Sequence, residues 1–511
     1  MSRFISAVTA ARAAVLPERT RVLALLVLAT GLRLYRLGDE NFWIDEVLQV
    51  RVASQPLATI FANYHPAADP GRYQQAPLSL LITHLFLSPS HAEWSARLPS
   101  ALFGVAGVFS LYLVGRGLFG PPTALLAALL LAISPLDIWY SQEARWYALW
   151  ALLTTLSYWA LLRASRRGGL RAWIAYATLT VLNLYTFLLS FAVAGLQALS
   201  AWRLQRAGAA GRGFAVRLAV TLSLLAAAVV PVLAIAATYL TPHPAPARPG
   251  TLAALPFTLF AYAMGFSLGP TIADLHNNAG MLSVAAEHPI AAIVLLLALT
   301  LLAAGIALAW RTPGAGDLLL PWLGGPFVLA FALALLLNIN YRVRYALVAL
   351  PAFLLLIAAG ITSLRSGLLR AAALAALLTC SLWSLANYYW NPRYDKEHVA
   401  DVLAYVRMTG IAGAPVVTVG EIGVAATYYG LGLAVVSLND CRAEFSQRDS
   451  ARLADFHQRP ELWLLSGRDW ENQTPACRAR LASSHETVAL RRYPGVDLYQ
   501  LRRRAPAAAQ G

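Results

Sequence analysis

Eleven long apolar runs, most of them joined by short loops, constrain the fold of this chain more than any other feature. About 17–25 consecutive apolar residues let a helix cross the hydrocarbon core of a bilayer, where lipid covers the apolar side chains. Hydrophobic residues make up 58% of the 511 residues and charged residues only 13%, which is about half the charged share of a soluble domain. The sequence therefore predicts a polytopic α-helical membrane protein with about 11 transmembrane helices. The runs lie near residues 20–38, 97–115, 121–137, 143–163, 171–187, 188–205, 216–240, 287–310, 316–338, 344–364 and 369–388.

The loops between these runs predict the orientation of the chain. Short cytoplasmic loops carry an excess of Lys and Arg. If the N-terminus is inside, every inner loop is short and carries at least one arginine: Arg116; Arg163, Arg166, Arg167 and Arg171; Arg203, Arg206, Arg212 and Arg217; Arg311; Arg365 and Arg370. This distribution also accounts for the formal charge of +15, which in a soluble chain would suggest a nucleic-acid partner. We therefore expect a multi-pass protein that contacts membrane lipid and binds no nucleic acid.

The same topology divides the chain into two domains. Residues 1–389 form the predicted transmembrane domain, with long outer loops at residues 39–96 and 241–286. Residues 390–511 follow the last crossing on the outer side and are richer in charged and polar residues. Strand-like runs with helix-like stretches between them predict a small C-terminal α/β soluble domain there. The strand-like runs are Pro415–Val419, Ala434–Leu438 and Glu461–Leu465.

The three cysteines, Cys380, Cys441 and Cys477, fit neither a zinc cluster nor a redox pair by their spacing. Cys441 and Cys477 both fall in the predicted external domain, where an oxidising compartment permits a disulfide. Whether they pair is left open, because a bond requires their Cα atoms to lie within about 7 Å.

The first candidate site follows the first crossing, where Asp45 and Glu46 are adjacent. Carboxylates are costly at membrane depth, so those at outer helix ends are functional candidates. Adjacent carboxylates repel each other, and one of them can therefore hold its proton more tightly and act as a base near neutral pH. The alternative is that the pair merely begins an exposed amphipathic helix, and both interpretations stay open.

Two further clusters lie at outer helix ends. Gln142, Glu143 and Arg145 occupy the turn between the third and fourth runs, where a carboxylate and a guanidinium can orient a hydroxyl and hold an anion. Arg344 and Tyr345 enter the tenth run, and a guanidinium there can clamp a phosphate. The alternatives are a structural ion pair between Glu143 and Arg145, and an Arg344 that reaches lipid headgroups. Because three clusters distant in sequence share one membrane face, we favour one site for an acceptor hydroxyl and a phosphate leaving group.

Several motifs resemble one group of enzymes. They are Arg97–Gly104 (Arg-Leu-Pro-Ser-Ala-Leu-Phe-Gly), Gly115-Arg116, Phe119-Gly120, the segment from Ser134-Pro135 to Arg145, Trp43–Glu46, and Val343–Tyr345 with Leu350-Pro351. They closely resemble the bacterial membrane glycosyltransferases of the GT-C type, similar to the protein O-mannosyltransferases and lipid A aminoarabinose transferases of the glycosyltransferase family 39. The similarity is clearest over residues 20–200 and weaker through residue 390.

The resemblance implies a polyprenyl-phosphate sugar donor and an inverting transfer to an acceptor hydroxyl on the outer face of the bacterial cytoplasmic (inner) membrane. By motif position Asp45 would be the catalytic base and Glu46 its supporting acid. Glu143 would contact the acceptor or a metal, and Arg344 would clamp the donor phosphate. The substrate-binding residues would be Gln142, Glu143, Arg145, Arg344 and Tyr345.

The chain departs from this family at two motifs. Gln74-Gln75-Ala76-Pro77-Leu78 stands where relatives often have a His or Asp ahead of Pro-Pro-Leu, and Tyr185-Thr186-Phe187 stands where they often end in His. The donor sugar therefore stays open, and so does a divalent metal, since no cofactor is certain. The acceptor could be a protein, lipid A or another glycolipid.

Two other functions compete with sugar transfer. A transporter or flippase for a lipid-linked sugar would also need charge in its interior, but such proteins commonly have repeated halves, and this sequence has no evident repeat. A non-catalytic binder of lipid-linked sugars would not need Asp45 and Glu46. We therefore expect a glycosyltransferase.

Overall fold

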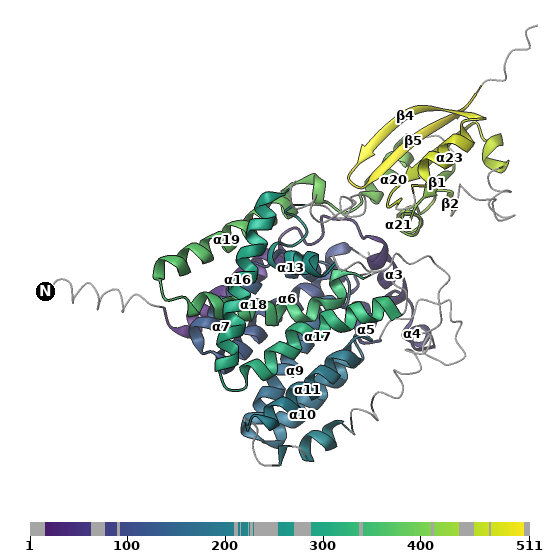
Figure 1. Cartoon of the computed structure of the whole chain (residues 1–511). Helices are drawn as coiled ribbons and strands as arrows, with labels where there is room; N and C mark the ends of the chain where they lie inside the picture. Colours follow the sequence, from purple (N-terminus) through teal and green to yellow (C-terminus); the bar gives the residue numbers. More distant parts are fainter. Residues whose placement is uncertain are drawn as a thin grey trace, which may run out of the picture. The chain divides into compact units, whose positions relative to one another are not determined.

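The structure, a computed structural model, describes residues 16–62, 77–88, 92–208, 213–214, 216–222, 224, 228, 254–269, 288–336, 341–409, 413–438, 454–469 and 472–504. The chain forms two compact units (Figure 1). The first unit contains residues 1–35, 56–86 and 97–387, and the second contains residues 36–55, 87–96 and 388–511. The second unit therefore combines the C-terminal part of the chain with two pieces of the predicted first outer loop.

The first unit is a helical bundle (Figure 1). Its elements are α2 (Glu18–Leu34), α4 (Leu57–Ala62), α5 (Pro77–Phe86), α6 (Glu93–Leu118), α7 (Pro121–Ala132), α8 (Pro135–Ser141), α9 (Tyr147–Arg167), α10 (Leu170–Leu184), α11 (Ser190–Arg206), α13 (Ala254–Met264), α16 (Pro289–Arg311), α17 (Ala315–Leu336), the 3-10 helix η1 (Val343–Ala349), α18 (Leu350–Ser363) and α19 (Gly367–Trp390). A helix lies over ten of the eleven predicted runs. The seventh predicted run, 216–240, falls mostly outside the described residues.

Several of these helices have the length and composition of membrane spans. Among the described residues, five spans are long and apolar enough to cross a bilayer: α6, α16, α17, η1 with α18, and α19. A sixth results if α7 and α8, which meet at 58°, form one broken span. The chain is therefore a multi-pass membrane protein, while the count of eleven crossings stays a prediction.

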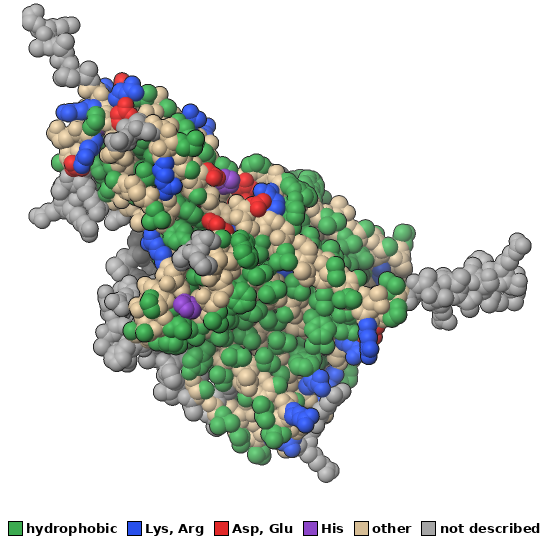
Figure 2. Space-filling view, turned by 180° about the vertical axis from the view of Figure 1, so that it is seen from behind, with side chains coloured by type: hydrophobic (Ala, Val, Ile, Leu, Met, Phe, Trp, Pro, Cys, Tyr) green, Lys and Arg blue, Asp and Glu red, His purple; other side chains and the backbone are tan. Residues whose placement is uncertain are grey.

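The surface of the helical unit is apolar. Hydrophobic side chains cover much of its visible face in Figure 2. Many of them are large and exposed, including Leu23, Val27, Leu85, Ile293, Leu296, Val328, Leu336 and Leu368. Such a surface is unfavourable in water but matches the hydrocarbon core of a bilayer, because lipid tails bury it.

Close helix packing organises the interior of this unit. Helix α18 is buried at every position from Leu350 to Ile361. It crosses α16 at two glycines, because a Cβ at Gly305 would overlap the carbonyl of Leu356, and a Cβ at Gly360 would overlap that of Leu301. Small residues that let two helix backbones touch are typical of membrane interfaces, where van der Waals packing drives association.

The arginine-bearing loops predicted to be cytoplasmic contact one another. An ion pair or a hydrogen bond to a carbonyl joins each consecutive pair of segments: Arg116 with Glu18 (2.9 Å), Arg166 with the Gly117 carbonyl (2.5 Å), Arg217 with the Gly168 carbonyl, and Arg203 with Asp317 (3.2 Å). The first four predicted inner loops therefore lie together at one end of the bundle, as the positive-inside rule predicts for loops on one membrane face.

The second unit contains a five-stranded sheet in the order β2-β1-β3-β5-β4. Strands β1 (Val416–Val419), β2 (Val435–Leu438) and β3 (Glu461–Ser466) are parallel, which confirms the three predicted strands. Strands β4 (His485–Tyr493) and β5 (Val496–Arg503) add an antiparallel hairpin that the sequence did not predict. Most of β4 is exposed, so it lacks the apolar alternation by which strands are recognised. The unit also contains α3 (Ile44–Ala53), α20 (Val399–Met408), α21 (Gly423–Tyr429) and α23 (Thr474–Leu481).

The core of the sheet includes one cysteine. Cys477 is fully buried and disulfide-bonded, whereas Cys380 in the helical unit is a free thiol. Cys441 lies outside the described residues. The pairing of Cys441 with Cys477 therefore stays a prediction.

Candidate active site

A break between α7 and α8 shapes the first part of the candidate site. Pro135 has no N–H, so the carbonyl of Leu131 loses the donor that a continuous helix would supply. The guanidinium of Arg33, in α2, donates to the carbonyls of Leu131 (3.1 Å) and Ala132 (3.0 Å) and forms a 2.5 Å ion pair with Asp137 in α8. The Arg33 side chain is fully buried. One arginine thus fixes the short helix that leads into the Gln142–Arg145 turn.

Two further contacts hold this turn against α2. The side-chain amide of Gln142 donates to the carbonyls of Arg33 (3.0 Å) and Tyr35 (2.8 Å). Gly104 of α6 leaves room for this packing, because a Cβ there would overlap the Ser141 hydroxyl and lie 2.6 Å from Nε of Arg33. Gln142 therefore uses its two amide hydrogens to anchor backbone.

Arg33→Met should destabilise the helical unit by about 3–5 kcal/mol, because it leaves the largely buried Asp137 carboxylate without its cation. The double variant Arg33→Met/Asp137→Leu should recover most of that loss, since a buried ion pair can be replaced by apolar side chains at little cost. Thermal unfolding of the detergent-purified proteins measures both. Equal unfolding temperatures for the wild type and Arg33→Met would show that the ion pair does not stabilise the break.

Glu143 and Arg145 are both buried in the turn between α8 and α9, and each contacts an aromatic side chain. The Nε1 of Trp139 donates to Oε1 of Glu143 at 2.8 Å. The Arg145 guanidinium lies 3.6 Å from the ring centroid of Trp146 and 5.8 Å from that of Tyr147. Stacking of this kind holds a guanidinium flat while its N–H edge can still donate.

Arg344 approaches the same aromatic ring from a distant part of the sequence. It lies in η1, which precedes the Leu350-Pro351 start of α18. Its guanidinium carbon is 5.7 Å from the centroid of Tyr147. Two guanidinium groups, Arg145 and Arg344, therefore lie beside one tyrosine. The sequence had no signal for Tyr147, whose ring also contacts Tyr140 edge-on at 5.0 Å.

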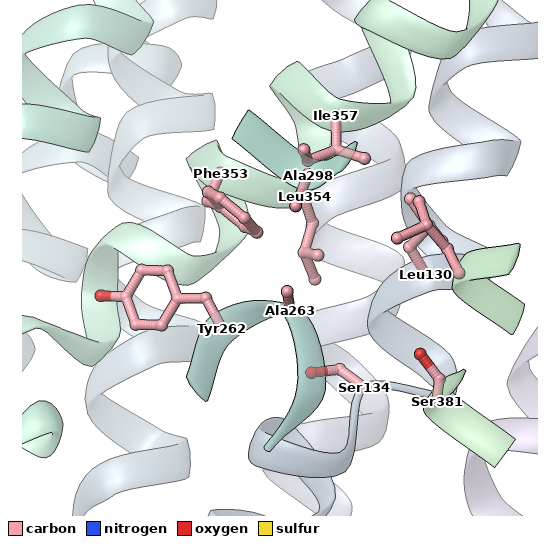
Figure 3. Close-up of a pocket in the computed structure, with 10 residues that line it drawn as sticks. Leu130, Ser134, Tyr262, Ala263, Ala298, Phe353, Leu354, Ile357 and Ser381 are labelled. Atoms are coloured by element: carbon pink, nitrogen blue, oxygen red, sulfur yellow. The ribbon is translucent and has the colours of Figure 1, made fainter. Parts of the chain in front are cut away.

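The cavities near this cluster are small. Figure 3 shows one next to the α7–α8 break, with the hydroxyl groups of Ser134 and Ser381 among apolar side chains and the Tyr262 hydroxyl pointing away. Its volume of about 20 Å³ has room for roughly one water molecule. Tyr345 lines a cavity of about 10 Å³ between α9, α11, α17 and η1. Neither cavity holds a sugar or a prenyl chain as it stands.

Asp45 and Glu46 lie in the second unit, in the first turn of α3. Consecutive residues of a helix point about 100° apart, and the two side chains differ accordingly. Asp45 is half-buried, whereas Glu46 is fully buried. Glu46 accepts a hydrogen bond from the backbone N–H of Trp43 at 3.4 Å, which fixes the start of the helix. A carboxylate in the first helical turn is also favoured by the helix dipole.

The buried Glu46 carboxylate has a cation partner in the segment that follows α19. The Nζ of Lys396 lies 3.2 Å from Oε2 of Glu46, and the Lys396 side chain is 6% exposed. The backbone N–H of Lys396 donates to Oε2 of Glu40 at 3.1 Å. Residues 350 positions apart thus meet within one unit.

Glu40, Asp395 and His398 form a cluster with possible metal ligands in the same unit. One ligand atom from each lies within 4.8 Å of the others. Burial raises the pKa of the Glu40 carboxyl, and the charge of Asp395 raises it further. Burial also raises the pKa of the Asp395 carboxyl. The other ring nitrogen of His398 is 3.0 Å from Asp401, an arrangement common for histidines that bind metal. Carboxylate and imidazole groups suit a divalent ion such as zinc.

Sequence comparison links the central part of the chain to a known family. Residues 74–233 match the model of the dolichyl-phosphate-mannose-protein mannosyltransferase family. YkcB of Bacillus subtilis, which carries the provisional description of a mannosyltransferase, is 28% identical over 173 residues, covering 31% of this chain and 23% of YkcB. YycA of the same organism, similarly described, is 29% identical over 148 residues, covering 28% and 22%. The matches span less than a quarter of either relative.

Structural comparison extends over nearly the whole chain. ArnT of Cupriavidus metallidurans bound to undecaprenyl phosphate has a TM-score of 0.53 at 14% identity, with 94% of this chain and 97% of ArnT covered. The oligosaccharyltransferase AglB of Archaeoglobus fulgidus, solved with an inhibitory peptide and a dolichol-phosphate, has a TM-score of 0.57 at 13% identity, with 91% and 70% covered. At such identities the likeness is one of fold. Residues 74–233 are therefore similar to the mannosyltransferases of this family, and the chain shares the fold of the membrane glycosyltransferases ArnT and AglB.

Proposed function

We propose that this glycosyltransferase moves a sugar from a polyprenyl-phosphate donor to an acceptor hydroxyl on the outer face of the cytoplasmic membrane, with inversion at the sugar C1. The observation that carries the proposal is that two guanidinium groups, those of Arg145 and Arg344, lie beside the ring of Tyr147 although they come from distant parts of the sequence. Such a pair suits a phosphate, which guanidinium groups bind through paired hydrogen bonds. The polyprenyl phosphates in the ArnT and AglB structures support a donor of this class.

The proposed reaction breaks the bond between C1 of the sugar and the phosphate oxygen. The electron pair of that bond leaves on the phosphate, and the acceptor oxygen bonds to the opposite face of C1. The proton of the acceptor hydroxyl passes to Asp45. The leaving phosphate gains negative charge in the transition state, so Arg145 and Arg344 would stabilise it more than the bound donor.

Glu143 is the proposed contact for the acceptor. Its carboxylate is buried and is held by the indole N–H of Trp139, so it would accept a hydrogen bond from an incoming hydroxyl without reorganising. The acceptor itself could be a protein, lipid A or another glycolipid. AglB was solved with a peptide, which supports a protein acceptor by analogy of fold alone.

A divalent metal fits the second unit best at Glu40, Asp395 and His398. These three residues supply two carboxylates and an imidazole, and one solved structure of the A. fulgidus enzyme contains zinc. A bound ion would add positive charge near the segment that carries Asp45. We propose that residues 390–511 lie on the outer side of the membrane, because the arginine-bearing loops predict that the inner face lies on the opposite side. Cleavage of these residues by protease added to intact spheroplasts checks this location.

The direct test is to reconstitute the purified protein in nanodiscs with a panel of polyprenyl-phosphate sugars and candidate acceptors. Release of polyprenyl phosphate together with a glycosylated product supports the proposal. A donor that moves between leaflets of a sealed liposome without losing its sugar would instead identify a flippase and contradict it. Parallel assays with chelator, and with chelator followed by zinc or manganese, should show loss and recovery if the metal takes part; unchanged rates would exclude that role.

A further inference from the structure

Lys396 is the only lysine among the 40 basic residues of the chain. It is buried, and its ammonium group contacts the fully buried carboxylate of Glu46 at 3.2 Å. It lies between Asp395 and Glu397, in the segment that leads from α19 to α20. An ammonium is a compact charge with three donors, whereas a guanidinium brings five donors that would all need partners in a buried space. A lysine at this one position is therefore chemically distinct from the arginines elsewhere.

The surroundings of this ion pair are charged on several sides. Glu40 accepts from the Lys396 backbone, and Asp45 is the neighbour of Glu46 in α3. The elements around it also carry other charged or titratable groups. They include Arg36 and Asp39 before α3, Arg51 in α3, Glu93 at the start of α6, Asp395, Glu397 and His398 in the exit segment, Asp401 and Arg407 in α20, Tyr428 and Tyr429 in α21, and Arg468 after β3.

We infer that Lys396 is a positioning residue for the proposed sugar transfer: its ammonium keeps the Glu46 carboxylate charged and fixed behind Asp45. The inference rests on the proposed function, in which Asp45 takes the acceptor proton. A negative charge on Glu46 favours the protonated form of a neighbouring carboxyl. It therefore makes Asp45 a stronger base at the moment the acceptor proton is transferred. Without Lys396, the buried Glu46 would take up a proton instead.

Lys396→Met should therefore change the pH dependence of turnover. Glu46 would titrate within the assay range, so the acid limb of the profile should move up by about one to two pH units. At pH 7 turnover should fall roughly 10–100-fold, because each pH unit by which the acid limb moves lowers the fraction of charged Glu46 about tenfold. Activity should return towards pH 9. A residue that only supported the fold would lower turnover at all pH values alike.

Two further variants separate the charge effect from packing. Lys396→Arg restores a cation and should keep the acid limb within about half a unit of the wild type, even if the larger group slows turnover. The double variant Lys396→Met/Glu46→Gln has no titrating carboxyl at position 46, so its profile should lose the displacement. It also removes both charges, so it stays informative if Lys396→Met alone does not fold. Arg393→Met, an exposed cation three residues earlier in the same segment, is the matched control and should leave the profile unchanged.

The experiment is a pH–rate profile of sugar transfer by the full-length protein and these four variants, with unfolding temperatures measured in parallel. A Lys396→Met profile that parallels the wild type overturns the inference while leaving sugar transfer intact. So does a Lys396→Arg profile displaced as far as that of Lys396→Met, or a displacement that persists in the double variant. Absence of transfer by the wild type on every donor would overturn the proposed function instead. The alkaline recovery of folded Lys396→Met is the result that supports the inference.

Discussion

Asp45→Asn should lower the turnover of the purified protein by about 10² or more. The acceptor hydroxyl is a poor nucleophile, and removal of its proton as C1 is attacked is the step that a carboxylate can accelerate. Asparagine keeps the size of the side chain and its hydrogen-bonding capacity but cannot accept the proton. Asp45 is half-buried in the first turn of α3, so the substitution should leave the unfolding temperature nearly unchanged. Turnover is measured as polyprenyl phosphate released from the best donor of the panel.

Two variants separate this role from the roles of the neighbouring carboxylates. Glu46→Gln should lower turnover less than Asp45→Asn, because Glu46 is buried against Lys396 and acts through Asp45. Glu143→Gln should mainly weaken acceptor use, visible as a raised KM for the acceptor. Near-native turnover of Asp45→Asn on the correct donor would show that the base lies elsewhere, and the variant with the largest loss would then identify it.

Arg344→Ala should reduce kcat/KM for the donor by roughly 30–1,000-fold, which corresponds to a loss of about 2–4 kcal/mol of transition-state stabilisation. The substitution removes one of the two guanidinium groups beside Tyr147, so a phosphate bound there loses a charged partner both in the bound donor and in the transition state. Donor affinity and turnover should therefore fall together. Binding of a fluorescent polyprenyl phosphate, measured alongside turnover, distinguishes the two contributions.

The controls for Arg344 come from its own segment. Arg344→Lys should recover only part of the loss, since a point charge does not reproduce a planar fork with parallel N–H groups. Arg342→Ala removes an exposed arginine two residues earlier and should leave donor binding within about twofold, because a screened surface charge contributes little. Equal losses in the Arg342 and Arg344 variants would indicate a general effect of surface charge on membrane association.

The sequence predicts the helical unit well because lipid imposes a simple rule on it. In lipid, a run of some twenty apolar residues must satisfy its backbone N–H and C=O groups within the run itself. A helix therefore forms almost regardless of tertiary contacts. The three parallel strands were predictable for a related reason, since buried strands such as Val416–Val419 consist of β-branched and mostly apolar residues. The β4–β5 hairpin was not, because most of its first strand faces solvent.

The candidate site was predictable only in its charged residues. Asp45, Glu143 and Arg344 attract attention because carboxylates and guanidinium groups near membrane spans need a reason. Their partners carry no such signal. Tyr147 looks like any interfacial tyrosine, and Lys396 meets Glu46 across 350 positions of sequence, a pairing that no local pattern encodes. Arg33 did carry a signal, a charge inside the first apolar run, and the same rule would have singled it out.

The break between α7 and α8 has a consequence for the biogenesis of the protein. Arg33 and Asp137 are 104 residues apart, and a ribosome that adds about 5–20 residues per second needs roughly 5–20 s to synthesise that length. During this interval α2 has already entered the translocation machinery with a charge that costs at least about 2.5–3.5 kcal/mol at the centre of the bilayer. Its guanidinium can be satisfied only by water or headgroups until the α7 carbonyls and Asp137 emerge. Helix α2 is therefore inserted early but packs against its partners late. Cysteine cross-linking of arrested nascent chains should join α2 to α8 only in chains long enough to expose Asp137.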